Sequence, residues 1–299
     1  MVNKHRNYLS PSILWFLKKT GKVDPEEAVK AEATRLLYAA GLTTPPFEPR
    51  RVAHIQKVAS INRSDISIVS QLTPIKGGFN ITLKSLNAHD AASISRNTFS
   101  IAHEIGHTLF YDVESAIPSR PHGDLGSEAE ERLCNIFAAE LLMPQYQFKS
   151  DAGAIFKKTS NWCESLFRLR SLYRVSMRAA VERVVELEIV RGAVFVKWRW
   201  KPKVSSGSDV KLRVDWSIPL KEGRYYFVWP DKPAPNDSTF LRASAEDCLI
   251  REVARLKLGA LNGEFIVEAR SYDSSDKELS GASTHLPRSV LSVIWPKLE

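Results

Sequence analysis

The segment HEIGH at residues 103–107 constrains this chain most, because it places two histidines and a glutamate within one predicted helix. Apolar residues recur around it with helical spacing and predict a helix over residues 95–111. Residues four apart in a helix lie on the same face, so His103 and His107 can direct their imidazoles at one metal ion. This spacing favours metal-assisted hydrolysis, with Glu104 as the general base that takes a proton from water.

A hydrolytic zinc site uses three protein ligands and leaves a fourth position for water, so a third ligand is expected from another helix. A helix predicted over residues 128–143 supplies Glu131, and Asn135 follows one turn later, where it can hydrogen-bond a ligand imidazole. Three other glutamates of this helix compete for the ligand role: Glu128, Glu130 and Glu140. Glu130 points about 100° away from Glu131 around the helix axis. Glu140 is the second candidate for the third ligand after Glu131.

Two motifs in order resemble the ImmA/IrrE family of metallopeptidases: SRNTFSIAHEIGH at residues 95–107 and ERLCNIFAAELLMP at residues 131–144. The resemblance covers about residues 25–190. It implies zinc as the cofactor, His103, His107 and Glu131 as its ligands, and Glu104 as the catalytic residue.

The resemblance also implies a function and a partner. Members of this family cleave a regulatory protein, typically a helix-turn-helix repressor, and thereby switch on stress, DNA-damage or phage-defence genes. The competing hypothesis is a DNA-binding regulator or sensor whose zinc site is not catalytic. Some longer family members carry a GAF-like sensor domain at the C-terminal end.

The chain of 299 residues is expected to be an α+β protein with three parts. Residues 1–150 are interpreted as a zincin-like metallopeptidase domain, 151–190 as a helix-turn-helix-like pair, and 191–299 as a C-terminal α+β, sensor-like domain of GAF-like type. The expected strands are residues 66–69, 79–83, 193–200, 210–216, 224–229 and 265–272, with a helix near 245–257. Residues 79–83 are either an ordinary core strand or an edge strand that pairs with an extended substrate.

The composition predicts the cellular compartment and argues against a disulfide framework and a cysteine-based zinc site. No run of about 18 to 20 apolar residues and no signal-type leader occurs, so we expect a cytoplasmic protein without a membrane partner. The three cysteines are scattered and predict neither a disulfide framework nor a cysteine-based zinc site. Cys134 is expected to be a packed helix cysteine, with a metal-capping thiol as the alternative. The isolated histidines His89, His122 and His285 are expected at the surface, His122 with a possible oxyanion role.

The net charge of +8 is concentrated in residues 151–203, which hold 12 basic and 5 acidic residues. Cations alternate with aromatic rings in a set that resembles a single-stranded-DNA surface: Arg168, Arg170, Arg174, Arg178, Lys197, Trp198, Arg199, Trp200 and Lys201. If residues 193–200 form a strand, however, Trp198 and Trp200 share one face and can belong to the core. Single-stranded DNA as an activator of the peptidase is the competing hypothesis.

Overall fold

The structure is a computed structural model that describes residues 10–85, 93–121, 126–159, 161–203, 210–219, 227–258, 260–272 and 289–297. The chain divides into two compact units: Met1–Phe148 with Leu172–Val175, and Lys149–Ser171 with Ser176–Glu299. The three domains expected over residues 1–150, 151–190 and 191–299 stay a prediction. The three isolated histidines lie outside the described residues. Most of the segment 271–283, which is rich in serine and aspartate and was expected to form a loop or a hairpin tip, also lies outside them.

The first unit begins with helices whose starts are marked by proline at the first helical position: α1 Pro11–Thr20, α2 Pro25–Ala39 and α3 Pro49–Ala53, followed by the short 3₁₀ helix η2 His54–Gln56. The Asp24 carboxylate accepts hydrogen bonds from the backbone N–H groups of Glu26 and Glu27 and so caps α2. The buried faces of α1 and α2 contribute Phe16, Val29 and Leu36 to the core.

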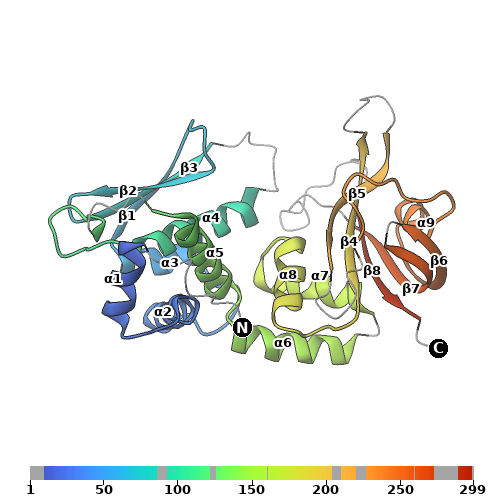
Figure 1. The fold of residues 1–299 in the computed structure, drawn as a ribbon, viewed down its shortest axis with the longest axis horizontal. Helices are drawn as coiled ribbons and strands as arrows, with labels where there is room; N and C mark the ends of the chain where they lie inside the picture. The colour runs from blue at the N-terminus through green and yellow to red at the C-terminus, as the bar shows by residue number, and fades with distance from the viewer. Residues whose placement is uncertain are drawn as a thin grey trace. The chain divides into compact units, whose positions relative to one another are not determined.

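A three-stranded sheet follows, formed by β1 Val58–Ser64, β2 Ser70–Ile75 and β3 Gly78–Lys84 in the order β1-β3-β2 (Figure 1). Strand β3 is central, parallel to β1 and antiparallel to β2. Of the two alternatives for residues 79–83, the ordinary core strand is confirmed and the edge strand was wrong, because both neighbours hydrogen-bond to this segment and its apolar side chains are buried. Residues 66–69 are not a strand either: they form the bend before β2, where Ile68 and Val69 are exposed.

The two predicted site helices are α4 Ser93–Thr108 and α5 Glu128–Leu142, which Figure 1 shows packed together below the sheet. Gly106 allows their close approach. A Cβ atom at this position would lie 3.2 Å from Cys134 Cα and 3.2 Å from a ring carbon of Phe137, tighter than ordinary side-chain contacts. The glycine of the HEIGH segment thus brings α5 close to the histidine-bearing face of α4.

Helix α6 Gln145–Lys158 follows Pro144 and was not expected from the sequence. Proline is also compatible with the first turn of a new helix, and Phe148 N–H donates to the Pro144 carbonyl. The expected helix pair follows as α7 Trp162–Tyr173 and α8 Met177–Glu186, and Ser176 caps α8 through its hydroxyl group.

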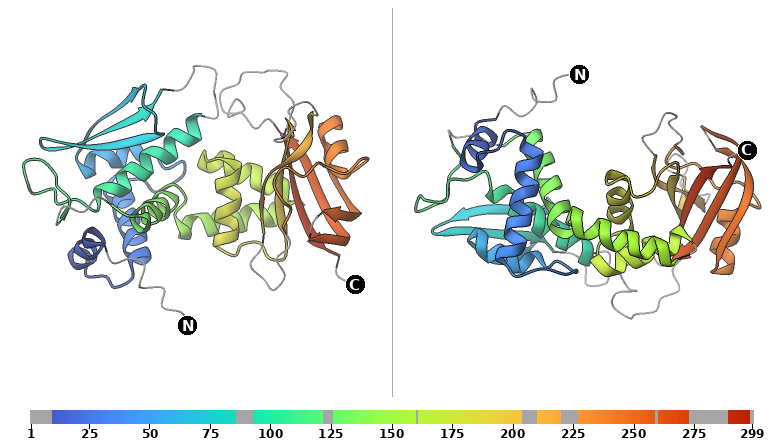
Figure 2. Two further views of the ribbon diagram at one scale, coloured as in Figure 1. Left: turned by 45° about the horizontal axis from the view of Figure 1, so that its top comes forward. Right: turned by 90° about the horizontal axis from the view of Figure 1, so that it is seen from below.

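The second unit contains a five-stranded antiparallel sheet in the order β5-β4-β8-β7-β6. Its strands are β4 Val194–Pro202, β5 Val210–Ile218, β6 Leu249–Leu258, β7 Leu261–Tyr272 and β8 Ser289–Pro296. Helices α7 and α8 lie on one face, and α9 Thr239–Glu246 lies on the other (Figure 2). The expected helix at 245–257 was wrong: alternating side chains there form β6. Residues 227–229 are not in a strand, and the rest of the expected strand 224–229 lies outside the described residues.

The mixed α+β class is thus confirmed, whereas the GAF-like assignment stays a prediction. Within the described residues, no helix combines the length and apolarity needed to cross a membrane.

Candidate metal centre

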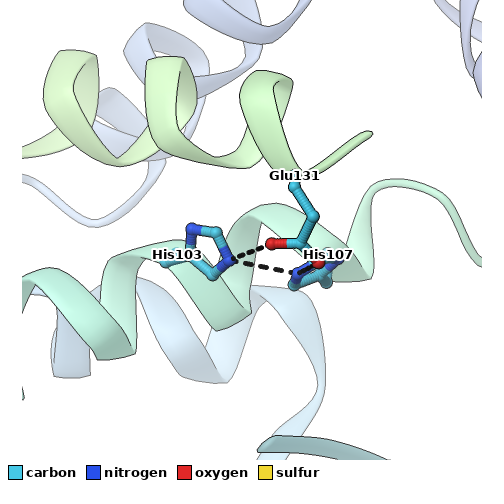
Figure 3. Close-up of side chains that lie close together, drawn as sticks. All are labelled: His103, His107 and Glu131. Carbon is cyan, nitrogen blue, oxygen red and sulfur yellow. Dashed lines mark hydrogen bonds and ion pairs between the residues drawn. The ribbon is translucent and has the colours of Figure 1, made fainter. Parts of the chain in front are cut away.

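The side chains of His103, His107 and Glu131 converge between α4 and α5 (Figure 3). His103 Nε2 lies 3.2 Å from His107 Nε2 and 3.1 Å from Glu131 Oε2. His107 Nε2 lies 3.3 Å from Glu131 Oε1. The two histidines come from successive turns of α4, and the glutamate comes from the first turn of α5.

This spacing fits a tetrahedral metal ion. With metal–ligand bonds of about 2.0 to 2.1 Å, neighbouring ligand atoms of a tetrahedral zinc site lie about 3.3 Å apart. The three measured separations are close to that value. Two imidazoles and one carboxylate are also a common ligand set of catalytic zinc. The residues present therefore fit a zinc ion.

The other ring nitrogens are fixed by hydrogen bonds. His103 Nδ1–H donates to Asn135 Oδ1 at 3.0 Å, and His107 Nδ1–H donates to Glu130 Oε1 at 2.8 Å. Such bonds select the tautomer that leaves Nε2 free for a metal. Arg120 in turn donates to both carboxylate oxygens of Glu130, at 2.6 and 2.8 Å. His107 is therefore held by an arginine–glutamate pair, in which the glutamate side chain is 1% exposed.

The ionisation of these groups suits cation binding. Hydrogen bonding to His107, together with the charges of both imidazoles, lowers the pKa of Glu131 to about 2. Burial lowers the pKa of His103 and favours the neutral imidazole that binds metals. Burial also acts to lower the pKa of His107, but hydrogen bonds with Cys134, Glu130 and Glu131 outweigh it and raise that pKa. The acceptors that stabilise a proton on His107 would also stabilise a metal cation.

Glu104 lies beside the three candidate ligands in a cleft of about 840 Å³ that all four residues line. Its side chain is held by Ser70 of β2, whose hydroxyl group donates to Glu104 Oε1 at 2.6 Å. Residues 68–72 line the same cleft, so strand β2 and the bend before it form one wall. Glu104 is positioned next to both the candidate metal and this strand.

The competing glutamates are placed elsewhere. Glu140 accepts a hydrogen bond from the backbone N–H of Gln145 and so caps α6. Glu128 is exposed in the first turn of α5, and Glu130 lies behind His107 rather than at the candidate metal position.

The roles of Glu130, Arg120 and Ser70 were not expected from the sequence. A ligand histidine needs an acceptor for its second nitrogen, so Glu130 next to Glu131 was a usable signal. Arg120 and Ser70 lie outside both motifs, and no local pattern marks them.

A second cluster, His107, Glu130 and Cys134, also has its potential ligand atoms within 4.8 Å of one another. Burial raises the pKa of Cys134 to about 11, which favours the thiol over the thiolate that binds metals. Glu130 is already paired with Arg120. The geometry therefore favours the packed-cysteine interpretation of Cys134.

The two aromatic residues of the predicted DNA surface lie on the core-facing side of β4. Trp198 is fully buried, stacks on Phe240 with ring centroids 4.3 Å apart, and donates to Ser292 Oγ. Trp200 is partly buried against the same core and donates to Ser244 Oγ. Trp198 is thus inaccessible to a base, as expected for the core alternative.

Most cations of that predicted surface are paired. The ion pairs are Arg168–Glu164, Arg174–Glu48, Arg178–Glu182, Lys197–Asp215 and Lys201–Asp231. Arg170 is only 3% exposed, whereas Arg199 is exposed. Binding of single-stranded DNA stays a prediction that rests on net charge alone.

Two histidines on one helix with a glutamate beside them, and a further glutamate from a second helix, match the residue pattern of an HExxH metallopeptidase. Residues 76–185 match the profile of the IrrE N-terminal-like domain, a metallopeptidase family, so this part of the chain is an IrrE N-terminal-like domain. The resemblance seen in the two motifs is confirmed.

A search of curated proteins gives no match. Among solved structures, a Mycobacterium tuberculosis transcriptional regulator is similar at 13% identity and a TM-score of 0.46, over 94% of this chain and 91% of that chain. Nothing about function follows from a likeness at this level.

Proposed function

We propose that the protein is a zinc-dependent endopeptidase that cleaves a regulatory protein. The observation that supports this proposal most directly is the convergence of His103, His107 and Glu131 beside Glu104 within an IrrE N-terminal-like domain. A purely structural metal site would need no general base in an open cleft. Here Glu104 lines a cleft large enough for a peptide segment.

Zinc held by the three ligands would acidify a water molecule and polarise the carbonyl of a peptide bond. Glu104 would act as the general base that accepts a proton from water in the cleft and donates it to the leaving amine. Ser70 keeps the Glu104 carboxylate oriented toward the cleft through its hydrogen bond. Asn135 and Glu130 hold the two imidazoles with their Nε2 atoms facing the candidate metal position.

Strand β2 provides a place for the substrate backbone. It pairs with β3 on one side, and its residues Ser70, Gln71 and Leu72 line the cleft. An extended peptide can add to such an edge through backbone hydrogen bonds. We therefore assign to β2 the substrate-pairing role first considered for residues 79–83.

The family resemblance makes a helix-turn-helix repressor the first substrate to test, with stress, DNA-damage or phage-defence genes as its targets. The second unit is proposed to sense the activating signal. The alternative of a DNA-binding regulator with a non-catalytic metal site is less favoured, because the general base and its positioning hydrogen bond are both present.

The decisive experiment incubates the zinc-loaded protein with the repressor encoded beside its gene, with and without single-stranded DNA. We expect cleavage that a chelator abolishes and zinc restores. The Glu104→Gln variant should bind zinc with unchanged stoichiometry and cleave nothing. Equal cleavage by Glu104→Gln, or cleavage that is insensitive to chelation, would contradict the proposed mechanism.

A further inference from the structure

Two arginines line the cleft of the candidate metal centre, and their environments differ. Arg120 is bound to both oxygens of Glu130 and lies over the ring of Tyr111 at 4.7 Å, so its charge is already neutralised. Arg96 is exposed, and among the described residues no carboxylate lies within ion-pair distance of it. A cation is therefore available in the cleft for a group that comes from outside.

The position of Arg96 relates it to the peptide bond to be cleaved. It precedes His103 by seven residues, which is two helical turns, so both residues lie on the same face of α4. Two turns correspond to about 10 Å along the helix axis. An extended peptide advances about 3.3 Å per residue. The Arg96 guanidinium is thus within reach of a substrate side chain about three residues from the cleaved bond.

Apolar side chains lie between and opposite these two positions. Phe99, half-way between Arg96 and His103 on α4, is partly buried, with its ring tilted against the His103 imidazole. Across the cleft, Ile68 and Val69 are 51% and 57% exposed just before β2. Exposed apolar side chains beside a cleft provide a contact for an apolar substrate side chain.

The other charges of the cleft leave the region of Arg96 attractive to anions. The carboxylates among the cleft-lining residues are Glu104 and Glu131. Glu131 is a candidate metal ligand, so a bound cation offsets its charge, and Glu104 is hydrogen-bonded to Ser70.

We propose that Arg96 is a specificity site of the peptidase, and that its substrates carry aspartate or glutamate about three residues from the cleaved bond, with an apolar residue between. This inference rests on the proposed endopeptidase function. It names a class of substrate segment: an extended strand that is acidic at one end and apolar next to the cleaved bond.

The test uses a synthetic mixture of peptides of random sequence and the zinc-loaded full-length protein. Mass spectrometry identifies the cleaved bonds, with Glu104→Gln as the blank. We expect acidic residues to be enriched about fivefold at one position near three residues from the cleaved bond, the magnitude of an exposed ion pair. Arg96→Gln should abolish the enrichment, and Arg96→Glu should replace it by enrichment of lysine and arginine.

Arg63→Glu is the matched control, because Arg63 is an exposed arginine of β1 that does not line the cleft. It makes the same charge change in the same unit and should leave the preference unaltered. A second measurement is independent of turnover: fluorescent peptides that differ only by glutamate or glutamine should bind Glu104→Gln with affinities that differ about fivefold, and equally once Arg96→Gln is added.

The outcomes separate the two proposals. Cleavage of the mixture without any acidic preference, or with a preference that Arg96→Glu leaves unchanged, overturns the specificity site and leaves the endopeptidase function intact. If the wild-type protein cleaves neither the mixture nor the repressor, both the proposed function and this inference are overturned.

Discussion

Replacing Arg120 with methionine tests whether the arginine–glutamate pair behind His107 supports the metal centre. The side chains of Arg120 and Glu130 are 17% and 1% exposed, and two hydrogen bonds join them. Methionine keeps part of the apolar stem and removes the charge. The Glu130 carboxylate then stays buried with His107 as its remaining charged partner.

The size of the effect follows from this burial. Removing one partner of a buried ion pair costs about 3 to 5 kcal/mol, and we expect about 3 kcal/mol because Arg120 keeps some solvent contact. The matched control is Arg132→Met, which breaks the exposed pair between Arg132 of α5 and Glu26 of α2. An exposed pair contributes about 0 to 1 kcal/mol.

The two units can unfold separately, so a single unfolding midpoint would mix them. Hydrogen exchange of the amides in α4 and α5 reports on the first unit alone. Zinc affinity, measured by competition with a coloured chelator, should fall about 10- to 100-fold in Arg120→Met, since His107 loses its fixed orientation. Arg132→Met should change neither quantity appreciably.

Two results would contradict a role of the Arg120–Glu130 pair in the metal centre. If Arg120→Met keeps wild-type zinc affinity, the orientation of His107 does not depend on the pair. If Arg132→Met and Arg120→Met lose equal protection against exchange, the buried ion pair contributes no more to the stability of the first unit than the exposed one.

Three further predictions concern other parts of the molecule. Ser70→Ala removes the hydrogen bond to Glu104, and we expect kcat to fall about tenfold at unchanged zinc content, measured on the cleaved repressor. Glu268 is fully buried, and burial raises its pKa above the ordinary value of 4.5, so its ionisation opposes folding as pH rises above that value. Glu268→Gln should therefore raise the melting temperature at about pH 7 but hardly at about pH 4. An equal increase at both pH values would contradict this prediction. Trp198→Ala should destabilise the second unit by about 3 to 5 kcal/mol in denaturant unfolding, whereas Trp229→Ala, at a 55% exposed position, should change it by about 0.5 kcal/mol or less.

What the sequence could predict lies mostly within single helices. The positions of His103 and His107 follow from the helical repeat, and the placement of Glu131 and Asn135 one turn apart follows from the same repeat on a second helix. The structure brings these four side chains together as the two motifs indicated. Local periodicity is sufficient here because a helix fixes the relative directions of its own side chains.

Only the tertiary structure decided which strand forms the wall of the cleft and which residues hold the site. Strand order depends on packing between distant segments, so the pattern of residues 79–83 did not show that β3 is central and β2 is the edge. Arg120 reaches Glu130 from the segment between α4 and α5, and Ser70 reaches Glu104 across 34 residues of chain. Alternation along β4 placed Trp198 and Trp200 on one face, but only the packing of α9 against that face showed it to be the core.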